Sequence, residues 1–240
     1  MIDKENTLSV VLPVLLHDWY LYKLTINCIN NLRYFTYPYK VQIIMVHNQS
    51  QLFPQIKGEL TEDDIYLPQE GVNLRPGKCL NLGFAHAKSD YLCILANDLM
   101  VHYDWYKYAK EAIDTNQLDI VIPWLLRNDM EWYLKKVENK EYIQEDTFTS
   151  GAGSLSVFKR STYERIGPFD ENLVMVCDRD YLLRIKELSY TNPVKVGHHL
   201  LCHATHLGSM TWSGGQHKDL LDWGDFEDNI YFNKKWGRNS

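Results

Sequence analysis

The sequence has no basic cluster, no Cys-x-x-Cys pair and no apolar stretch long enough to cross a membrane. Its formal net charge is −6, which disfavours a protein that binds nucleic acid through the phosphate backbone. The longest strongly apolar stretch, LSVVLPVLL (8–16), is much shorter than the roughly 18 residues of a transmembrane helix. The five cysteines are scattered along the chain. This spacing predicts reduced, buried thiols rather than a disulfide framework.

Signals for export and for common nucleotide loops are also missing. The first residues, MIDKENT, contain no basic region followed by an apolar one, so we expect no secretory signal and a cytoplasmic location. The small-residue stretch GAGS (151–154) matches neither GxGxxG nor a Walker motif. It suits either an ordinary turn or close approach of the backbone to a sugar. No repeat or Gly/Ser linker divides the chain, so a single domain is predicted over residues 1–240.

Apolar runs alternate with amphipathic segments in the first half of the chain. This alternation predicts a mostly parallel sheet covered by helices on both faces, an α/β fold of three layers. A Rossmann-like half is expected over about 1–125, and a half with a mixed sheet over about 126–240. The predicted strands are 8–14, 41–46, 64–68, 91–96, 119–125 and 154–158. The predicted helices are 18–35, 76–88, 104–114, 178–188 and 218–235.

The ends of four predicted strands are candidate site positions. The first strand ends at Pro13-Val14, the second is followed by His47-Asn48, the third leads to NLRPGKCLN (73–81), and the fourth is followed by Asn97-Asp98. In a parallel α/β sheet, such strand ends meet in one crevice, where ligands bind. A carboxylate after the apolar strand YLCILA has two readings: a turn or helix cap, or a ligand of a metal ion or phosphate at the sheet edge.

Several short segments, in order along the chain, together resemble the family-two glycosyltransferases, which are inverting sugar-nucleotide enzymes of GT-A fold. The resemblance covers roughly residues 8 to 237. It rests on LSVVLPV (8–14), NLRPGKCLNLG (73–83), LANDLMVHYDW (95–105), GPFDENLVMVCDRDYLLR (167–184), HLGS (206–209) and YFNKKWG (231–237). The first half would then bind the nucleotide sugar, and the second half would form the acceptor side.

The resemblance implies a donor site with a divalent metal, Mn²⁺ or Mg²⁺. Asp98 is in the position of the metal carboxylate, and His206 is a second candidate ligand facing the metal or the diphosphate. A hard cation would offset charge on the departing diphosphate, and Arg75 and Lys78 could add positive charge. The residues expected to bind the donor are Pro13, Val14, His47, Asn48, Asn73, Arg75, Lys78 and Asn97.

The segment CDRDYLLR (177–184) supplies the candidate general base. Asp180 and Arg184 have the i,i+4 spacing of a structural ion pair, which leaves Asp178 to take the proton from an acceptor hydroxyl. Asp178 could instead simply favour the helix N-terminus.

Three positions differ from the usual family pattern. His47 stands where an Asp that holds the base or ribose is common, Ala96 replaces the first acidic or amide residue before Asp98, and Cys177 replaces a Glu. Loss of that Glu removes a like charge beside Asp178, which favours its ionised form.

The predicted function is metal-dependent transfer of a sugar from a nucleotide-diphosphate sugar to an acceptor hydroxyl. The acceptor could belong to a glycan, a lipid-linked sugar, a protein or a modified nucleic-acid base. The alternatives are a GT-A-like binding module without turnover and, less favoured, a sugar nucleotidyltransferase, which would carry a Gly-rich basic loop where this chain has PVLLHDWY (13–20). Trp212 and the following SGG (213–215) could form a lid or an ordinary surface loop.

Overall fold

The first strand, β1 (Thr7–Leu15), is buried along most of its length and pairs in parallel with β2 on one side and β4 on the other. A continuous run of branched apolar residues suits a strand covered on both faces. The computed structural model describes residues 3–125, 130–145, 153–173, 176–188, 190–207 and 228–237.

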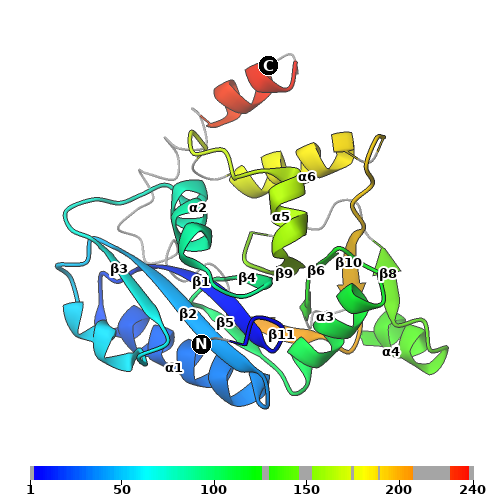
Figure 1. The fold of residues 1–240 in the computed structure, drawn as a ribbon, viewed down its shortest axis with the longest axis horizontal. Coiled ribbons are helices and arrows are strands. Elements are labelled where there is room, and N and C mark those ends of the chain that lie inside the picture. The colour runs from blue at the N-terminus through cyan, green and yellow to red at the C-terminus, as the bar shows by residue number, and fades with distance from the viewer. Residues whose placement is uncertain are drawn as a thin grey trace.

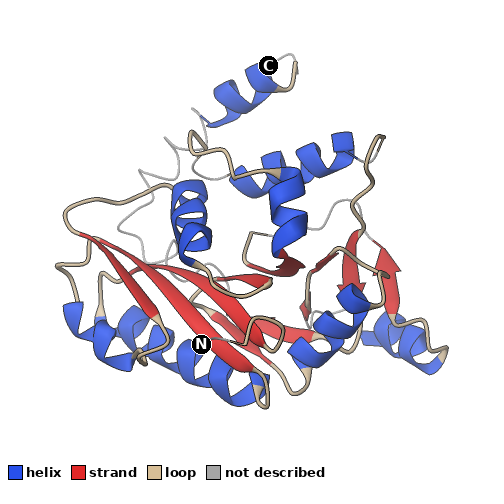
Figure 2. Cartoon of the chain, viewed as in Figure 1, coloured by secondary structure: helices blue, strands red, loops and turns tan. Residues whose placement is uncertain are grey.

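The large sheet has eight strands in the order β3-β2-β1-β4-β9-β6-β10-β8 (Figures 1 and 2). Only β9 and β8 run against the others, because β9 is antiparallel to both neighbours and β8 is antiparallel to β10. The sheet draws strands from both halves of the sequence. Its other strands are β2 (Lys40–Asn48), β3 (Ile65–Gln69), β4 (Tyr91–Leu95), β6 (Ile120–Val121), β8 (Ile143–Glu145), β9 (Leu155–Lys159) and β10 (Val196–His199).

Helices cover both faces of this sheet, as Figure 2 shows. Alternate residues of β1 point to opposite faces: Val10 joins a core cluster with α1 and α3, and Val11 joins a cluster with α2, α5 and α6. The three predicted layers are therefore confirmed. The helices are α1 (Trp19–Thr36), α2 (Pro76–His86), α3 (Trp105–Asp114), α4 (Met130–Glu138), α5 (Arg160–Ile166), α6 (Cys177–Leu188) and the short 3-10 helix η1 (Pro54–Glu59).

A second, three-stranded sheet has the order β5-β11-β7 and consists of β5 (Leu99–Val101), β11 (His203–His206) and β7 (Trp124–Leu125). β5 follows β4 closely in the sequence, so the Asn97-Asp98 pair lies at the turn from the large sheet to the small one. Residues 228–235 form a further helix, drawn in red in Figure 1 on the side of the sheet that carries α2 and α6.

Most predicted elements of the first half are confirmed, each to within a few residues. Asp18 caps α1 as expected, its carboxylate accepting a hydrogen bond from the Leu21 N–H at 2.8 Å. The single strand predicted over 119–125 is wrong: it is split into β6 and β7, which belong to different sheets. Pro123 lies between them, and proline cannot donate a ladder hydrogen bond.

All five cysteines are buried free thiols, as predicted. No helix in the described part of the chain is long and apolar enough to cross a membrane. The region predicted as a final helix, 218–235, is described only from residue 228, where it is helical.

Candidate active site

Asp98 lies where the two sheets meet. Its carboxylate Oδ1 is 3.3 Å from His206 Nε2, and its backbone carbonyl accepts a hydrogen bond from the Leu207 N–H at 3.0 Å. The antiparallel pairing of β5 with β11, with His206 opposite Leu99, brings the two side chains together. The Asp98 side chain is 5% exposed and the His206 side chain 23% exposed. The two predicted metal ligands are thus adjacent, although their role stays a prediction.

The residues preceding Asp98 are held firmly by protein groups. The Asn97 amide donates to Thr25 Oγ1 at 2.9 Å, and the Ala96 N–H donates to the Ser154 carbonyl at 2.8 Å. Burial, followed by the negative charge of Asp98, raises the pKa of the Cys28 thiol to about 12. The thiol therefore stays protonated at neutral pH.

Asp178 lies in the first turn of α6, as predicted. Its Oδ1 accepts a hydrogen bond from the Arg179 N–H at 2.8 Å, and no side chain in the described ranges forms an ion pair with it. Burial raises the pKa of this carboxyl above its ordinary value. A Cβ added to Gly153 would lie 2.8 Å from Asp178 Cβ, so the Gly153 backbone approaches Asp178 closely.

The same strand edge connects Asp178 with Asp98. Leu95 at the end of β4 is paired with Leu155 at the start of β9, and the next backbone bond joins Ala96 to Ser154. Gly153, adjacent to Ser154, lies against Asp178. The carboxyl end of β4 leads to Asp98, and the residues before β9 contact Asp178. Both carboxylates therefore belong to the same edge of the sheet. The predicted convergence from distant parts of the sequence is consistent with this arrangement.

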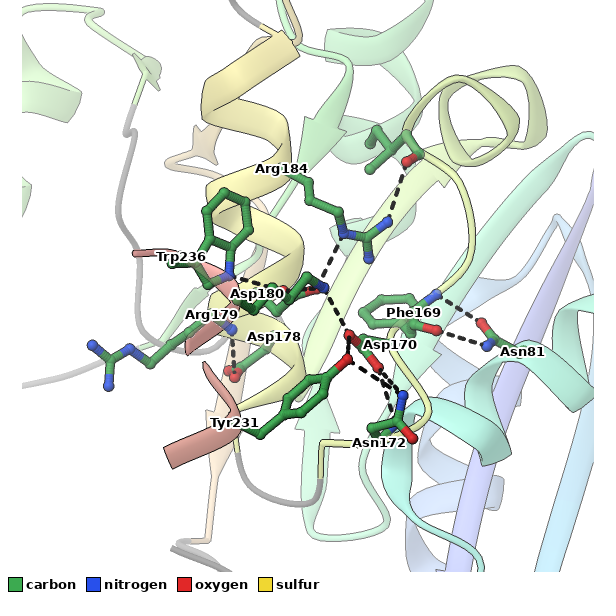
Figure 3. Close-up of polar contacts among 12 residues, drawn as sticks. Asn81, Phe169, Asp170, Asn172, Asp178, Arg179, Asp180, Arg184, Tyr231 and Trp236 are labelled. Atoms are coloured by element: carbon green, nitrogen blue, oxygen red, sulfur yellow. Dashed lines mark hydrogen bonds and ion pairs between the residues drawn. The ribbon is translucent and has the colours of Figure 1, made fainter. Parts of the chain in front are cut away.

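Asp180 has a different environment from Asp178, although both lie in the first turn of α6. Its side chain is 0% exposed and forms ion pairs with Arg184 Nε at 3.1 Å and Lys235 Nζ at 2.6 Å. It also accepts a hydrogen bond from Trp236 Nε1 at 3.0 Å (Figure 3). The predicted Asp180–Arg184 pair is confirmed. Lys235 and Trp236 are additional partners that the spacing within 177–184 does not reveal.

Two residues predicted to bind the donor are buried at the end of β2. His47 is 0% exposed, its Nδ1 is 2.8 Å from the Tyr66 hydroxyl, and burial lowers its pKa to about 4. The imidazole is therefore neutral at pH 7. Asn48 Oδ1 accepts a hydrogen bond from the Leu74 N–H at 2.9 Å. Asn48 thus also fixes the start of the segment that leads into α2.

The remaining donor candidates differ in exposure. Asn73, Arg75 and Lys78 are exposed before and within the first turn of α2, and the Arg75 guanidinium donates to the Asn172 carbonyl. Pro13 is partly exposed in β1, whereas Val14 is buried. The structure therefore places three polar candidates at the surface beside α2.

Asn81, within the segment 73–83, has a supporting role that the sequence pattern does not predict. The Asn81 side chain accepts from the Phe169 N–H at 2.8 Å and donates to the Phe169 carbonyl at 2.9 Å. It also contacts the Tyr163 hydroxyl at 3.1 Å and Glu171 Oε1 at 3.0 Å. The Asn81 amide is thus engaged by Tyr163 of α5 and by the 169–172 loop, and it fixes that loop against α2 (Figure 3).

His203, the other histidine of the CHATH segment, is engaged within the small-sheet region. Its Nε2 is 2.8 Å from the Tyr133 hydroxyl. The candidate loop at Trp212 and 213–215 lies outside the described residues, as do Gly208 and Ser209 of HLGS and Gly151 and Ala152 of GAGS.

Comparison with known proteins identifies the family and the fold. The model of glycosyl transferase family 2 matches residues 9–182. The chain belongs to this family. The expected family resemblance is thereby confirmed, and the matched range contains most of β1 as well as Asp98 and Asp178. None of the curated proteins matches significantly.

Among solved structures, the chain is similar to S. aureus TarS. A structure of TarS 1–349 has a TM-score of 0.57 at 14% sequence identity, with 80% of this chain and 57% of that chain covered. A UDP-GlcNAc complex of TarS 1–349 has a TM-score of 0.57 at 16% identity, with coverages of 80% and 55%. The chain thus spans little more than half the length of these structures. The likeness shows the GT-A-like fold.

Proposed function

We propose that this family 2 member is an inverting glycosyltransferase that moves a sugar from a nucleotide-diphosphate sugar to an acceptor hydroxyl. The observation that carries the proposal is the connection of Asp98 and Asp178 to one sheet edge through the start of β9. The TarS structures with UDP and with UDP-GlcNAc favour uridine diphosphate sugars as the first donors to test.

Asp178 is proposed as the general base. As the acceptor oxygen attacks the anomeric carbon, its proton passes to the Asp178 carboxylate, and the bond from that carbon to the diphosphate oxygen breaks with its electrons on the diphosphate. One displacement inverts the configuration, with no covalent enzyme intermediate. A carboxylate whose pKa is raised by burial is a better proton acceptor than an ordinary Asp, which supports this role.

Asp98 and His206 are the residues that would hold Mn²⁺ or Mg²⁺. A carboxylate oxygen beside an imidazole nitrogen, 3.3 Å apart, suits Mn²⁺ better than Mg²⁺, which prefers oxygen ligands. The described residues contain no group of three or more metal-ligating side chains, so the donor diphosphate and water would complete the coordination. When bound, the ion supplies positive charge to the leaving diphosphate.

The exposed Arg75 and Lys78 are proposed to contact the donor phosphates, with Asn73 beside them. His47, Asn48, Asn97, Pro13 and Val14 are proposed to shape the donor site, the buried amides by fixing the backbone around it. The acceptor class and a cytoplasmic location stay predictions.

The test is a thermal-shift screen of the whole chain against nucleotide diphosphates and nucleotide sugars, with and without Mn²⁺, followed by an assay for release of the diphosphate. Preferential binding of a nucleotide to the folded state raises the melting temperature. We expect a metal-dependent shift with one nucleotide class and release of its diphosphate from the matching sugar. Absence of both would contradict the proposal.

A binding module without turnover is the second candidate. It is favoured by Ala96 at a position that could otherwise supply a second metal ligand, and by the engagement of the Asn97 amide with Thr25. A binding module would give the thermal shift but no release of diphosphate with any acceptor mixture. The retained Asp178, close to Gly153 and without an ion pair among the described residues, favours the enzyme.

A further inference from the structure

The segment of residues 228–237 packs against the first turn of α6 at several points. At its start, Asp228 Oδ2 accepts a hydrogen bond from the Val176 N–H at 3.3 Å. In its middle, Phe232 is 2% exposed and forms a small apolar cluster with Leu173, Val176 and Cys177. The segment therefore contacts the residues immediately before Asp178.

The end of the same segment contacts the residues after Asp178. Lys235 Nζ lies 2.6 Å from Asp180 Oδ1, and Trp236 Nε1 donates to the same oxygen at 3.0 Å. The Arg179 guanidinium lies 5.3 Å from the centre of the Phe232 ring. Asp178 itself faces Gly153 instead. Its neighbours on both sides are thus attached to segment 228–237, while its own carboxylate is left for the site.

Lys235 also joins α6 to the loop before it. Besides Asp180, its Nζ forms an ion pair with Asp170 Oδ2 at 2.7 Å, and the same Asp170 oxygen accepts from the Tyr231 hydroxyl at 3.0 Å (Figure 3). Burial raises the pKa of Asp170, but hydrogen bonds led by that from Lys235 outweigh it and lower the net value. One ammonium, with a side chain 29% exposed, therefore links two acidic groups from different elements.

We propose that Lys235, with Trp236, is a positioning residue for the general base: it fixes the first turn of α6 against the 169–172 loop and so sets the place of Asp178. The functional part of this inference rests on the proposed glycosyltransferase activity. The structural part, the fixing of the α6 turn, does not. Lys235 contacts Asp180 and Asp170, not the reacting atoms, so its effect on turnover would pass through Asp178.

The first experiment compares Lys235→Met with Lys235→Arg and with the control Lys234→Met by amide hydrogen exchange of the whole chain. Lys234 is exposed and forms no ion pair within the described residues. We expect exchange in peptides covering 169–173 and 176–183 to accelerate about tenfold in Lys235→Met, because local opening reports the lost attachment. Lys235→Arg and Lys234→Met should match the original chain. Unchanged exchange in Lys235→Met would overturn the proposal whatever the activity of the protein.

The second experiment measures release of diphosphate from the donor selected by the thermal-shift screen. We expect Lys235→Met to lower kcat about ten- to a hundredfold, because small displacements of a catalytic group are costly, while the donor KM changes less than about twofold. Lys235→Arg should restore most of kcat. A rise in KM with unchanged kcat would show that Lys235 does not act through the base.

Trp236→Phe and Asp170→Asn extend the test if Lys235→Met does not fold. Trp236→Phe removes the hydrogen bond to Asp180 together with part of the ring. Asp170→Asn keeps the size of the side chain and removes the negative charge that pairs with Lys235. Faster exchange in 176–183 in Trp236→Phe would support the proposal, and unchanged exchange in both variants would overturn it. If exchange responds to these variants but the original chain releases no diphosphate from any nucleotide sugar, the proposed function fails while the structural part of this inference stands.

Discussion

The surroundings of Asp98 and of Asp178 differ in what holds each carboxylate in place. Asp98 lies in a short turn between two sheets, where strand pairing and the Leu207 N–H fix its backbone. Asp178 lies on a helix whose first turn is held by side chains of residues 228–237, more than 50 positions away. The Asp98 region therefore depends mainly on the backbone ladder, and the Asp178 region on packing between distant segments.

This difference has a chemical counterpart. Asp98 lies beside His206, so one oxygen and one nitrogen are close enough to bind the same metal ion. Asp178 has no ion pair in the described part of the chain. The nearby cations Arg184 and Lys235 pair with Asp180 and Asp170, and the Arg179 guanidinium lies by the Phe232 ring. The surroundings of Asp98 suit a ligand of a cation, and those of Asp178 suit a carboxylate that accepts a proton. We therefore expect substitution of Asp98 to affect donor binding and substitution of Asp178 to affect kcat.

The largest expected effect is that of Asp178→Asn. The amide cannot accept the acceptor proton, so kcat should fall by about 10²- to 10⁴-fold while donor binding is retained. Steady-state assay of diphosphate release, with calorimetry for donor binding, checks this result. Asp180→Asn cannot serve as a neutral control because it breaks the Lys235 contact, so Asp104→Asn, on the α3 N-terminal side, serves instead. Near-normal kcat in Asp178→Asn would exclude Asp178 as the base.

The raised pKa of Asp178 also gives a pH dependence. The base acts when ionised, so kcat/KM should fall as the pH drops through a pKa above the ordinary Asp value of 3.8. The contribution of Asp178 to the free energy of unfolding changes with pH in the opposite direction. A pKa raised on folding favours the folded state at low pH, and that contribution is lost as the pH rises through the folded pKa. Asp178→Asn should therefore melt at the same or a higher temperature at pH 7, which a thermal melt against pH measures.

The next effect is that of Asp98→Asn, which should weaken metal-dependent donor binding by about ten- to a hundredfold, since the amide is a poorer ligand of a hard cation. Calorimetric titration of the donor with Mn²⁺ and with a chelator measures it. In Asp98→Asn, the donor affinity measured with Mn²⁺ should approach that measured with the chelator. Equal donor affinity with and without metal in the original chain would show that Asp98 has no metal role.

A smaller effect is expected for Gly153→Ala. The added methyl would lie 2.8 Å from Asp178 Cβ, so the distance between the Gly153 backbone and Asp178 must increase. We expect kcat to fall about tenfold with donor KM unchanged. Gly58→Ala is the matched control because no atom lies within 4 Å of its added Cβ. Comparable kcat in the two variants would show that the close approach of Gly153 does not set the position of Asp178.

The smallest effect on activity is expected for Asn81→Leu, which should instead lower stability. Removing the hydrogen bonds to Phe169 leaves a buried backbone group without its partner, at a cost of about 1–3 kcal/mol. Denaturant unfolding measures this value. A loss of stability without a change in kcat would show that Asn81 stabilises the 169–172 loop and does not affect the position of Asp178.

The periodicity of the sequence predicts the strands and helices of the first half well, because it depends on burial of residues near in sequence. It also predicts the Asp180–Arg184 pair, which lies within one helix. It does not predict that Lys235 joins Asp170 and Asp180, or that Asn81 holds Phe169, because these contacts depend on how whole elements pack. The division of 119–125 could have been suspected from Pro123, but not the second sheet that receives its latter part.

The direction of β9 has a consequence for how acceptor choice can change in this fold. Because β9 runs antiparallel to β4, its first residues, not its last, open onto the edge that carries Asp98. In the proposed reaction we therefore expect substitutions at Ser154, directly before β9, to change acceptor preference while β1, β2 and β4 keep their registers. Substitutions at Lys159, at the far end of the same strand, would leave substrate selection untouched.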